Sequence, residues 1–213
     1  MKDGDFVEIE YVGRLKDTNE IFDLTDEELA KKEGIFNEKA KYGPIKIVLG
    51  EKLVLEGLEE IIRGMNPGEE KTEALPPEKA FGERKADLVK VVPEAELRRQ
   101  KINPVPGMIL DMGEYKAKIQ SVNSGRVRID FNNPLAGREI EYKIKVSRAI
   151  EDTNEKAAII VEFFCRDAAE VKIDGSKAKI EAKAQLPEQV MQKVSELLKK
   201  HLSVEKVVFK REF

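Results

Sequence analysis

The chain has 213 residues and a formal net charge of −3, with 38 basic and 41 acidic side chains that are closely intermixed. A polyanion-binding surface needs one sign of charge on one face, so this composition argues against a nucleic-acid partner. No apolar run is long enough to cross a bilayer, and the acidic start MKDGD does not resemble a signal peptide. We therefore expect a cytoplasmic protein with no membrane partner and room for more than one domain.

The side chains that most enzymes use for covalent or metal chemistry are scarce. Cys165 and His201 are the only cysteine and histidine, so the chain has too few of these residues for an internal disulfide, a structural zinc site or a nucleophile–base dyad. Cys165 lies in the apolar run IIVEFFC, which predicts a buried, inert thiol. His201 follows two lysines at the end of a predicted helix, where a cation is favourable without any catalytic role. We expect no metal and no cofactor.

The N-terminal part alternates in a way that is typical of a sheet. Apolar residues at every second position, bounded by turn residues, predict strands over 6–12, 21–23, 45–49 and 69–75. Thr25 and Glu28 form a capping box for a short helix that ends near Gly34. A second helix is expected over 55–63, with its apolar side facing the sheet. The acidic pairs of this region, such as Glu59-Glu60, are interpreted as solvated helix faces.

The middle of the chain predicts a small β-rich module of about forty residues, too small to hold much core by itself. A short polar helix is expected over 93–101. Strands over 115–122 and 126–131 flank Asn123-Ser124-Gly125, a good hairpin turn. The alternating run IEYKIKV over 140–146 then indicates that the chain returns to the earlier sheet.

The C-terminal part predicts a separate unit after a polar linker at 151–155. We expect a strand over 158–164, a hairpin about Asp174-Gly175, a helix opened by Pro187 and a last strand over 204–209. This order is a βββαβ sandwich of about sixty residues. So small a unit would gain stability by pairing with a copy of itself, so we expect a homodimer.

Several motifs in register resemble the FKBP-type peptidyl-prolyl isomerases. They are EIEYVGRL, the Phe22-Asp23 pair, the run GPIKIVLGEKLVLEGLEEIIRGMNPGEE and the loop LPPEKAFGE, which fit in order and spacing over residues 3–85. The similarity resumes at Leu135-Ala136-Gly137 and the strand IEYKIKV. The segment between these parts sits where SlyD-like members carry an insert-in-flap chaperone domain. With its extra C-terminal unit and no His-rich tail, the chain is most similar to the long-type archaeal FKBPs.

The resemblance implies an α+β fold in three parts. An FKBP-like antiparallel β-sheet wrapped on a short helix is expected for a discontinuous isomerase domain of residues 1–86 and 132–151. A small β-rich insert-in-flap chaperone domain is expected over 87–131. A C-terminal α/β sandwich domain that mediates dimerisation is expected over 155–213.

The resemblance also implies a proline pocket, assigned here residue by residue. The residues placed at the reacting bond are Tyr11, Phe22, Asp23 and Phe81, and those that bind the substrate are Ile45, Val54, Leu55, Leu58, Leu135 and Tyr142. Leu58 stands where many members have Trp, Ile45 where an aromatic residue is frequent, and Phe81 where a Tyr hydroxyl commonly bonds the ligand. These departures predict a weaker site for macrolide inhibitors and a lower isomerase rate.

The same residues also have structural interpretations without a pocket. Val54, Leu55 and Leu58 fit the core-facing side of a helix, and Tyr11 and Tyr142 fit ordinary strand aromatics. Asp23 fits a turn-forming residue at the end of a strand. The family resemblance favours the pocket, most of all for Phe22, Asp23, Val54, Leu55 and Phe81.

The inserted module carries more apolar side chains than its size requires. An exposed, methionine-containing chaperone surface would use them, and the alternative places all of them in the module's own core. The set is Val89, Val91, Val92, Met108, Ile109, Leu110 and Met112.

The function expected from these features is a peptidyl-prolyl cis-trans isomerase that is also a folding chaperone. Its partners would be unfolded or nascent polypeptides that contain Xaa-Pro. Two other functions remain open from the sequence. One is a holdase with a vestigial prolyl pocket, and the other is an assembly protein that recruits a partner through its C-terminal unit.

Overall fold

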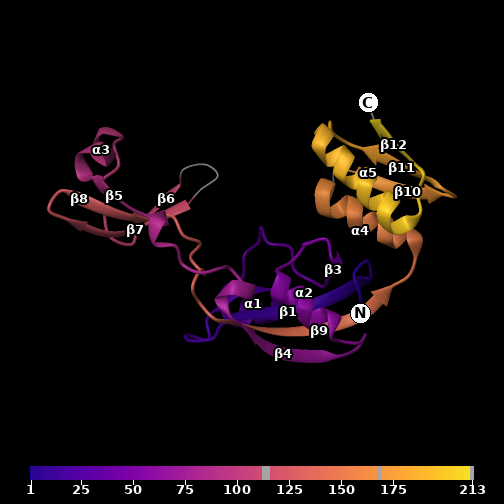
Figure 1. The fold of residues 1–213 in the computed structure, drawn as a ribbon, viewed down its shortest axis with the longest axis horizontal. Helices are drawn as coiled ribbons and strands as arrows, with labels where there is room; N and C mark the ends of the chain where they lie inside the picture. Colours follow the sequence, from indigo (N-terminus) through magenta and orange to yellow (C-terminus); the bar gives the residue numbers. More distant parts are fainter. Residues whose placement is uncertain (112–115, 167–168, 212–213) are drawn as a thin grey trace. The chain divides into compact units, whose positions relative to one another are not determined.

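The structure is a computed structural model that describes residues 1–111, 116–166 and 169–211 (Figure 1). It divides into two compact units, which are described separately. The first unit contains Met1–Ala74 and Glu141–Phe213, and the second contains Leu75–Ile140. Within the described ranges, every helix falls short of the length and hydropathy that crossing a bilayer requires.

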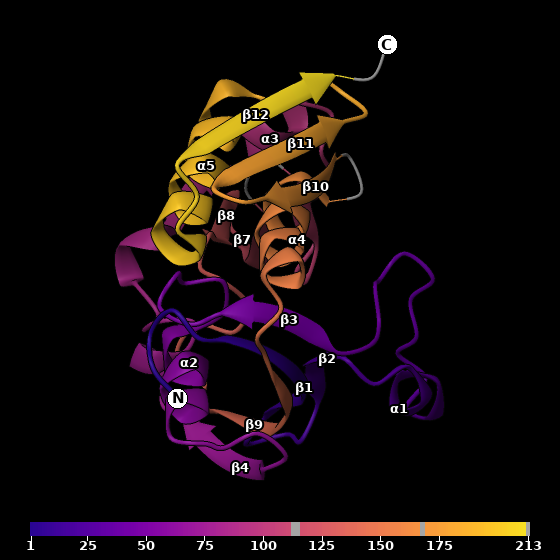
Figure 2. The same ribbon diagram turned by 90° about the vertical axis from the view of Figure 1, so that its right-hand side faces the viewer.

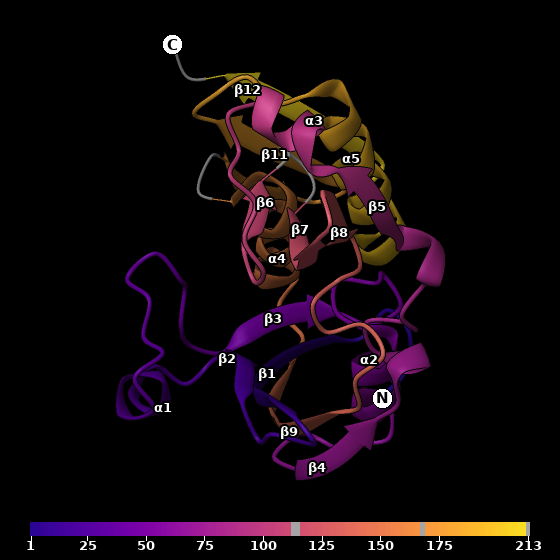
Figure 3. The ribbon, with the colours of Figure 1, turned by 90° about the vertical axis from the view of Figure 1, so that its left-hand side faces the viewer.

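A five-stranded sheet forms the base of the first unit. In chain order its strands are β1 (Phe6–Leu15), β2 (Ile21–Leu24), β3 (Ile45–Val48), β4 (Glu70–Leu75) and β9 (Ile140–Ile150). The order across the sheet is β2-β1-β9-β4, and β3 also pairs with β1. The sheet curves past α2 (Glu56–Arg63), which buries its apolar side (Figure 3). The strands and this helix are confirmed near their predicted bounds, and the return of β9 to the earlier sheet is confirmed.

The short helix α1 (Glu27–Lys32) begins one residue later than the predicted capping box. Asp26 is its N-cap, and the Asp26 carboxylate accepts a hydrogen bond from the Leu29 N–H at 2.9 Å. Thr25 is instead buried, where its hydroxyl accepts from the Tyr11 N–H at 2.9 Å and bonds the Tyr11 carbonyl at 3.2 Å. The Thr25 side chain therefore ties the end of β2 to β1 and leaves the cap to its neighbour.

The predicted strand over 158–164 is wrong, because this segment belongs to helix α4 (Thr153–Cys165). The predicted linker is wrong as well, because Asp152 is the N-cap and accepts from the Glu155 N–H at 2.7 Å. Ala157, Ile159, Ile160 and Val161 are all buried, so apolar side chains occupy several sides of the helix. A helix buried on more than one side lacks the 3.6-residue periodicity that reveals an amphipathic helix.

Three strands and one more helix complete the first unit, as the sequence predicted apart from α4. They are β10 (Ala169–Asp174), β11 (Lys177–Ala182), α5 (Glu188–Leu202) and β12 (Lys206–Arg211). β10 pairs antiparallel with β11, and β11 pairs parallel with β12. The helices α4 and α5 lie together against one face of these strands (Figure 2). The order is therefore αββαβ, in place of the expected βββαβ.

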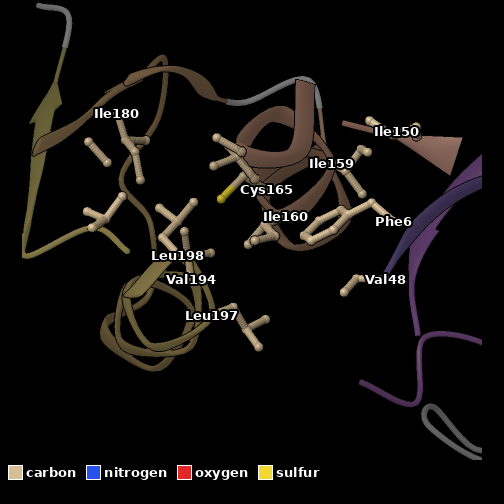
Figure 4. Close-up of a cluster of buried hydrophobic side chains, with 14 residues drawn as sticks. Phe6, Val48, Ile150, Ile159, Ile160, Cys165, Ile180, Val194, Leu197 and Leu198 are labelled. Carbon is tan, nitrogen blue, oxygen red and sulfur yellow. The ribbon is translucent and has the colours of Figure 1, made fainter. Parts of the chain in front are cut away.

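One hydrophobic core joins the C-terminal elements to the sheet. Phe6 of β1, Val48 of β3 and Ile150 of β9 belong to the same buried cluster as the side chains of α4 and α5 (Figure 4). Cys165 is buried in this cluster, and burial raises the pKa of its thiol, as expected for an inert cysteine. The expected start of a C-terminal domain at residue 155 falls inside α4.

The second unit is a small sheet with one short helix. After the 3₁₀ turns Pro77–Lys79 and Ala86–Leu88 come β5 (Val89–Pro93), α3 (Glu94–Arg99), β6 (Ile109–Asp111), β7 (Lys116–Asn123) and β8 (Arg126–Asp130). The strand order is β5-β8-β7-β6. The predicted hairpin is confirmed, and Ser124 and Gly125 at its turn both have positive φ, 48° and 72°. This is the conformation that favours glycine in tight hairpins.

An ion-pair cluster ties α4 to the sheet and gives a pH-dependent prediction. Glu155 pairs with Arg148 at 2.5 Å and with Lys46 at 2.8 Å, and Arg148 also pairs with Glu8 at 2.9 Å. Hydrogen bonds from Arg148 and Lys46 lower the pKa of Glu155 to about 2 from its usual 4.5.

Replacing Glu155 with glutamine should therefore lower the free energy of unfolding at pH 7 by about 1 kcal/mol. A carboxylate whose pKa is depressed in the folded state contributes stability above its unfolded pKa. That contribution disappears as the pH falls through the folded pKa, so the difference between the two proteins should close between pH 4.5 and 2. Urea unfolding across this range measures the difference, with Glu170→Gln at an exposed position of β10 as the control. A difference that stays constant with pH would contradict the prediction.

Candidate functional site

Three aromatic rings gather on one face of the sheet in the first unit. Tyr11 of β1, Phe22 of β2 and Tyr142 of β9 are neighbours because β1 lies between the other two strands. The Tyr142 ring meets Tyr11 and Phe22 edge to face, with centroid distances of 5.6 and 5.7 Å. Such T-shaped pairs are the preferred arrangement of aromatic rings and fix their orientation. The three rings form a preorganised apolar wall, called here the aromatic site.

Gly13 is the residue that lets these rings approach the sheet. A Cβ atom built on Gly13 would lie 2.7 Å from Phe22 Cζ and 2.8 Å from Tyr142 Cε1, well inside van der Waals contact. Gly13 was not among the residues predicted for the site. A glycine inside a strand is the available signal, because it often marks a close approach of another group to the backbone.

Replacing Gly13 with alanine should damage the aromatic site while leaving the fold in place. The added methyl group must displace both rings, and small displacements of groups around a reacting bond cost between about tenfold and about a hundredfold in rate. We expect a loss of this size in the catalytic efficiency toward an Xaa-Pro tetrapeptide. Unchanged circular dichroism would show that the fold persists, and an unchanged rate would contradict the role of the rings.

Asp23 places a carboxylate at the edge of the aromatic site. The Asp23 side chain is exposed, and the Tyr11 hydroxyl donates a hydrogen bond to its Oδ2 atom at 2.9 Å. Burial, together with the charge of Asp23 and this hydrogen bond, raises the pKa of Tyr11. Burial and the charge of Asp23 also raise the pKa of Tyr142. Both phenols therefore stay protonated, and Tyr11 remains a donor that orients the carboxylate.

The apolar residues predicted for substrate binding lie on β3 and around the start of α2. Val54 and Leu55 are half-buried, Leu58 is buried in α2, and Ile45 on β3 pairs with Ile9. Leu55 is the N-cap of α2 with an extended backbone at φ −56° and ψ 142°. The first N–H groups of a helix have no acceptor within the helix. Leu55 therefore presents an N–H donor beside an apolar side chain.

Glu59 holds the loop of residues 50–55, which carries Val54 and Leu55 and is called here the pocket loop. The Glu59 carboxylate accepts from the Gly50 N–H at 3.2 Å and the Lys52 N–H at 3.0 Å, and it pairs with Arg63 at 2.9 Å. The interpretation of Glu59 as a solvated charge is wrong, because Glu59 is buried. A buried carboxylate is stable here because its oxygens are satisfied by two amides and a guanidinium.

Lys200 and His201 of helix α5 also hold the pocket loop, through Glu51. Glu51 Oε1 lies 2.8 Å from His201 Nε2 and 2.6 Å from Lys200 Nζ, and the His201 ring meets Phe6 edge to face at 5.8 Å. Burial alone would raise the pKa of Glu51, but the hydrogen bonds from Lys200 and His201 outweigh it and lower that pKa. His201 therefore contacts the loop that leads into the predicted pocket, a role that its helix position alone did not reveal.

Two of the predicted site residues, Phe81 and Leu135, lie in the second unit, and both are half-buried. Their loops lie side by side, because the Gly137 N–H donates to the Gly82 carbonyl at 2.8 Å. The Leu135 N–H bonds the Asn133 side chain at 2.8 Å and shapes this turn. Their place in a prolyl pocket stays a prediction.

Some residues of the predicted chaperone surface are buried in the second unit, and others are exposed. Leu110 is buried in the core of the second unit, Val92 and Met108 pack against that core, and Val89 is half-buried. Val91 and Ile109 are 59% and 66% exposed. Met112 lies outside the described residues. The remaining candidates for an exposed surface are therefore Val91 and Ile109, joined by two residues that the sequence analysis missed, Leu88 and Val105.

The described residues contain no group of three or more histidine, cysteine, aspartate and glutamate side chains placed to hold a metal ion. What the first unit offers is apolar and aromatic surface, one oriented carboxylate and one helix-end amide. Such an arrangement can bind an apolar ring and polarise a carbonyl group. It is suited to changing the conformation of a bound chain without making or breaking covalent bonds.

Sequence comparison gives two family matches along this chain. Residues 1–98 match the family described as FKBP-type peptidyl-prolyl cis-trans isomerase, and residues 90–135 match the one described as FKBP26, IF domain. The solved structure of the three FKBP domains of wheat FKBP73 aligns with 71% of this chain and 40% of that chain, at 15% identity and a TM-score of 0.37.

The chain has relatives of similar sequence in several organisms. The short-type peptidyl-prolyl cis-trans isomerase of Methanocaldococcus jannaschii is 36% identical over 146 residues, which cover 68% of this chain and 92% of that protein. The FKBP-type 16 kDa peptidyl-prolyl cis-trans isomerase of Escherichia coli is 30% identical over 48% of this chain and 72% of its own length. SlyD of Treponema pallidum is 29% identical over 73% of this chain and 81% of its own length.

Proposed function

The chain belongs to the family of FKBP-type peptidyl-prolyl cis-trans isomerases, and we propose that it accelerates the isomerisation of Xaa-Pro bonds in unfolded or partly folded proteins, with folding-chaperone activity. The observation that carries the proposal is the aromatic site with its oriented Asp23 carboxylate, in the same unit as the apolar start of α2.

The reaction requires rotation about a bond rather than bond cleavage. Resonance in the peptide bond sets a barrier of about 18–20 kcal/mol, and at the transition state the bond is twisted and its charge separation is partly lost. An apolar site therefore destabilises the planar amide more than the twisted one, relative to water. This preference for the transition state needs no nucleophile, metal or proton transfer.

Each group in the site has a role in this mechanism. The proline ring is gripped by the apolar residues Phe22, Val54, Leu55 and Leu58 of the first unit, with Ile45 and Tyr142 completing the walls. The N–H of Leu55 donates to the carbonyl after the proline. Asp23 polarises the carbonyl that twists, and Tyr11 acts as a positioning residue through its hydrogen bond to Asp23.

We propose that the second unit supplies the chaperone activity. Val91 on β5 and Ile109 on β6 support this role, because both are large apolar side chains left exposed on the edge strands of this unit's sheet. A client held there is kept at a high local concentration near the prolyl site, which raises the apparent rate without changing the chemistry. The boundaries of this chaperone domain are proposed as 87–131, within an isomerase domain of 1–86 and 132–151.

Two further properties belong to this proposal. A homodimer formed through the C-terminal elements, proposed as a domain of 155–213, and a cytoplasmic location fit a chaperone of nascent chains. Sedimentation equilibrium of the intact protein tests the first, since one chain has a mass of 24.1 kDa and a dimer would have about twice that.

A protease-free assay on an Xaa-Pro tetrapeptide tests the isomerase activity. Uncatalysed isomerisation takes about 10–100 s at 25 °C, so even modest acceleration is measurable. Asp23→Ala and Asp23→Asn should each lower catalytic efficiency between about tenfold and about a hundredfold, the range expected for losing one interaction with a charged group.

Two controls make this test specific. Tyr11→Phe removes only the hydrogen bond to Asp23, and should lower kcat several-fold while KM stays unchanged. Glu20→Gln removes a nearby exposed charge and should have no effect. A wild-type rate equal to the uncatalysed one would refute the isomerase and leave a holdase with a vestigial pocket.

A further inference from the structure

A cleft of about 790 Å³ opens in the first unit between residues 39–46 and helix α4. Contact between α4 and β3 holds the two sides together (Figure 2). The apolar part of its lining comes from both sides, and consists of Tyr42, Pro44, Ile45, Ile159 and Phe163. We call it the α4 cleft.

The exposed apolar side chains of the first unit gather at this cleft. Among the residues described, the large exposed hydrophobic side chains of the unit are Phe163 at 48%, Ile35 at 42% and Phe36 at 40%. Phe163 lines the cleft, and Phe36 stacks on the cleft residue Tyr42 with a centroid distance of 5.4 Å. Ile35 is the neighbour of Phe36. An exposed aromatic cluster beside a concave surface is typical of a binding site.

The charges around the α4 cleft are mostly positive. Lys39, Lys41, Lys46 and Arg166 line it, against the single acid Glu162. Lys41 pairs with Glu162, and Lys46 pairs with Glu155. Lys39 and Arg166 form no ion pair with another described residue. The cleft therefore has a surplus of positive charge that complements carboxylates on a ligand.

The cleft shares Ile45 with the proposed prolyl site. This residue lines the cleft and also belongs to the wall assigned to the proline ring. An extended chain covers about 3.3–3.6 Å per residue, so a polypeptide bound at the proline would place its neighbours in the cleft within a few residues. Its occupant is therefore a continuation of the chain that carries the proline.

We propose that the α4 cleft binds the stretch of client polypeptide that flanks the isomerised proline, and that it selects aromatic or aliphatic side chains accompanied by carboxylates. The inference rests on the proposed function and adds a substrate preference to it. The C-terminal helix α4 then takes part in choosing substrates at the isomerase site.

The test compares two peptides in the protease-free assay. One is an Xaa-Pro tetrapeptide, and the other extends the same core by about six residues on one side of the proline, with two aromatic residues and two glutamates. Both directions of extension are made. The double variant Phe163→Ala/Lys39→Glu should raise KM for an extended peptide about tenfold, the effect of losing one aromatic anchor and its charge partner. The KM and kcat for the tetrapeptide should stay at the wild-type values.

Matched controls keep the result specific. Lys172→Glu/Val208→Ala makes the same kinds of change on the outer face of the strands β10 and β12, where these residues lie in one row across the sheet. It should leave both substrates unchanged. With the wild-type protein, an extended peptide that has glutamines in place of the glutamates should have a KM closer to that of the tetrapeptide. Added salt should raise the KM of the acidic peptide more than that of the glutamine peptide.

Three outcomes would overturn the proposal. One is an equal KM for the extended peptides in wild type and in the cleft variant. Another is a cleft variant that sediments as a single chain where the wild type sediments as a dimer, while its peptide kinetics stay unchanged. That result would assign the cleft to a contact between two copies of the chain. The third, no turnover of the tetrapeptide by wild type, would refute the proposed function itself, and this inference with it.

Discussion

Replacing Phe6 with alanine should lower the free energy of unfolding by about 3–5 kcal/mol. Phe6 is 2% exposed, its ring meets His201 edge to face, and Lys156 Nζ lies 5.6 Å from the ring centroid. Truncation removes a large apolar side chain and leaves a cavity between β1 and two helices that cannot easily collapse. Since a domain is stable by only about 5–15 kcal/mol, this is a large fraction of the total.

Urea unfolding followed by two probes measures this effect. Far-UV circular dichroism reports mainly the helices, and tyrosine fluorescence reports in part on the sheet, which carries Tyr11 and Tyr142 among the four tyrosines of the chain. The two transitions of the first unit should coincide and shift together, because Phe6 belongs to a core that the sheet shares with α4 and α5. Phe36→Ala, an exposed phenylalanine, should cost less than about 1 kcal/mol. Separate transitions with only the sheet destabilised would contradict the shared core.

Excising residues 87–131 should spare tetrapeptide isomerisation and abolish most of the acceleration of protein refolding. Holding a client beside a catalytic site commonly raises its apparent affinity by about 10²–10⁴, so losing that hold should slow the catalysed refolding of a proline-limited protein about a hundredfold or more. The efficiency on the tetrapeptide should stay within about twofold of wild type, because a short substrate does not need the second unit's sheet.

The structure shows where the excised chain can be rejoined. The Lys85 N–H donates to Asn132 Oδ1 at 2.8 Å, and Asn132 Nδ2 donates to the Lys85 carbonyl at 2.9 Å. The two chain segments that flank the excised part are therefore already in contact. A short glycine linker can close the gap. Val91→Ser/Ile109→Ser in the intact chain should reproduce part of the refolding defect, with Lys90→Ser as its control. An equal loss of catalytic efficiency on the tetrapeptide and on the refolding protein would refute the assignment of chaperone activity to the second unit.

Local sequence patterns predicted the elements that are buried on one side. The alternation in β1 and β9 and the 3.6-residue period in α2 and α5 follow from one apolar face against a core. In α4 the run from Ala157 to Val161 is buried on more than one side, so it carries no such period and was mistaken for a strand. The polar residues before it, read as a linker, contain the N-cap Asp152 and the first turn of the helix.

The candidate site was predictable only in part. The aromatic residues and Asp23 were predicted from the family resemblance, and the structure brings Tyr11, Phe22, Asp23 and Tyr142 together in the first unit. Glu59 was misread because nothing local in the sequence reveals that the chain at Gly50 and Lys52 folds back onto its carboxylate. Such contacts depend on the tertiary fold, and so does the Glu51 contact with His201, which spans 150 residues.

The contact between His201 and the pocket loop makes the protein its own spectroscopic reporter. Because the chain has a single histidine, one pair of imidazole resonances in a proton–nitrogen NMR spectrum belongs to this site. Those resonances report on the junction between the C-terminal helix and the loop that carries Val54 and Leu55. In a protein labelled uniformly with nitrogen-15, a client peptide that binds at the prolyl site can thus be followed through a single side chain that contacts this loop.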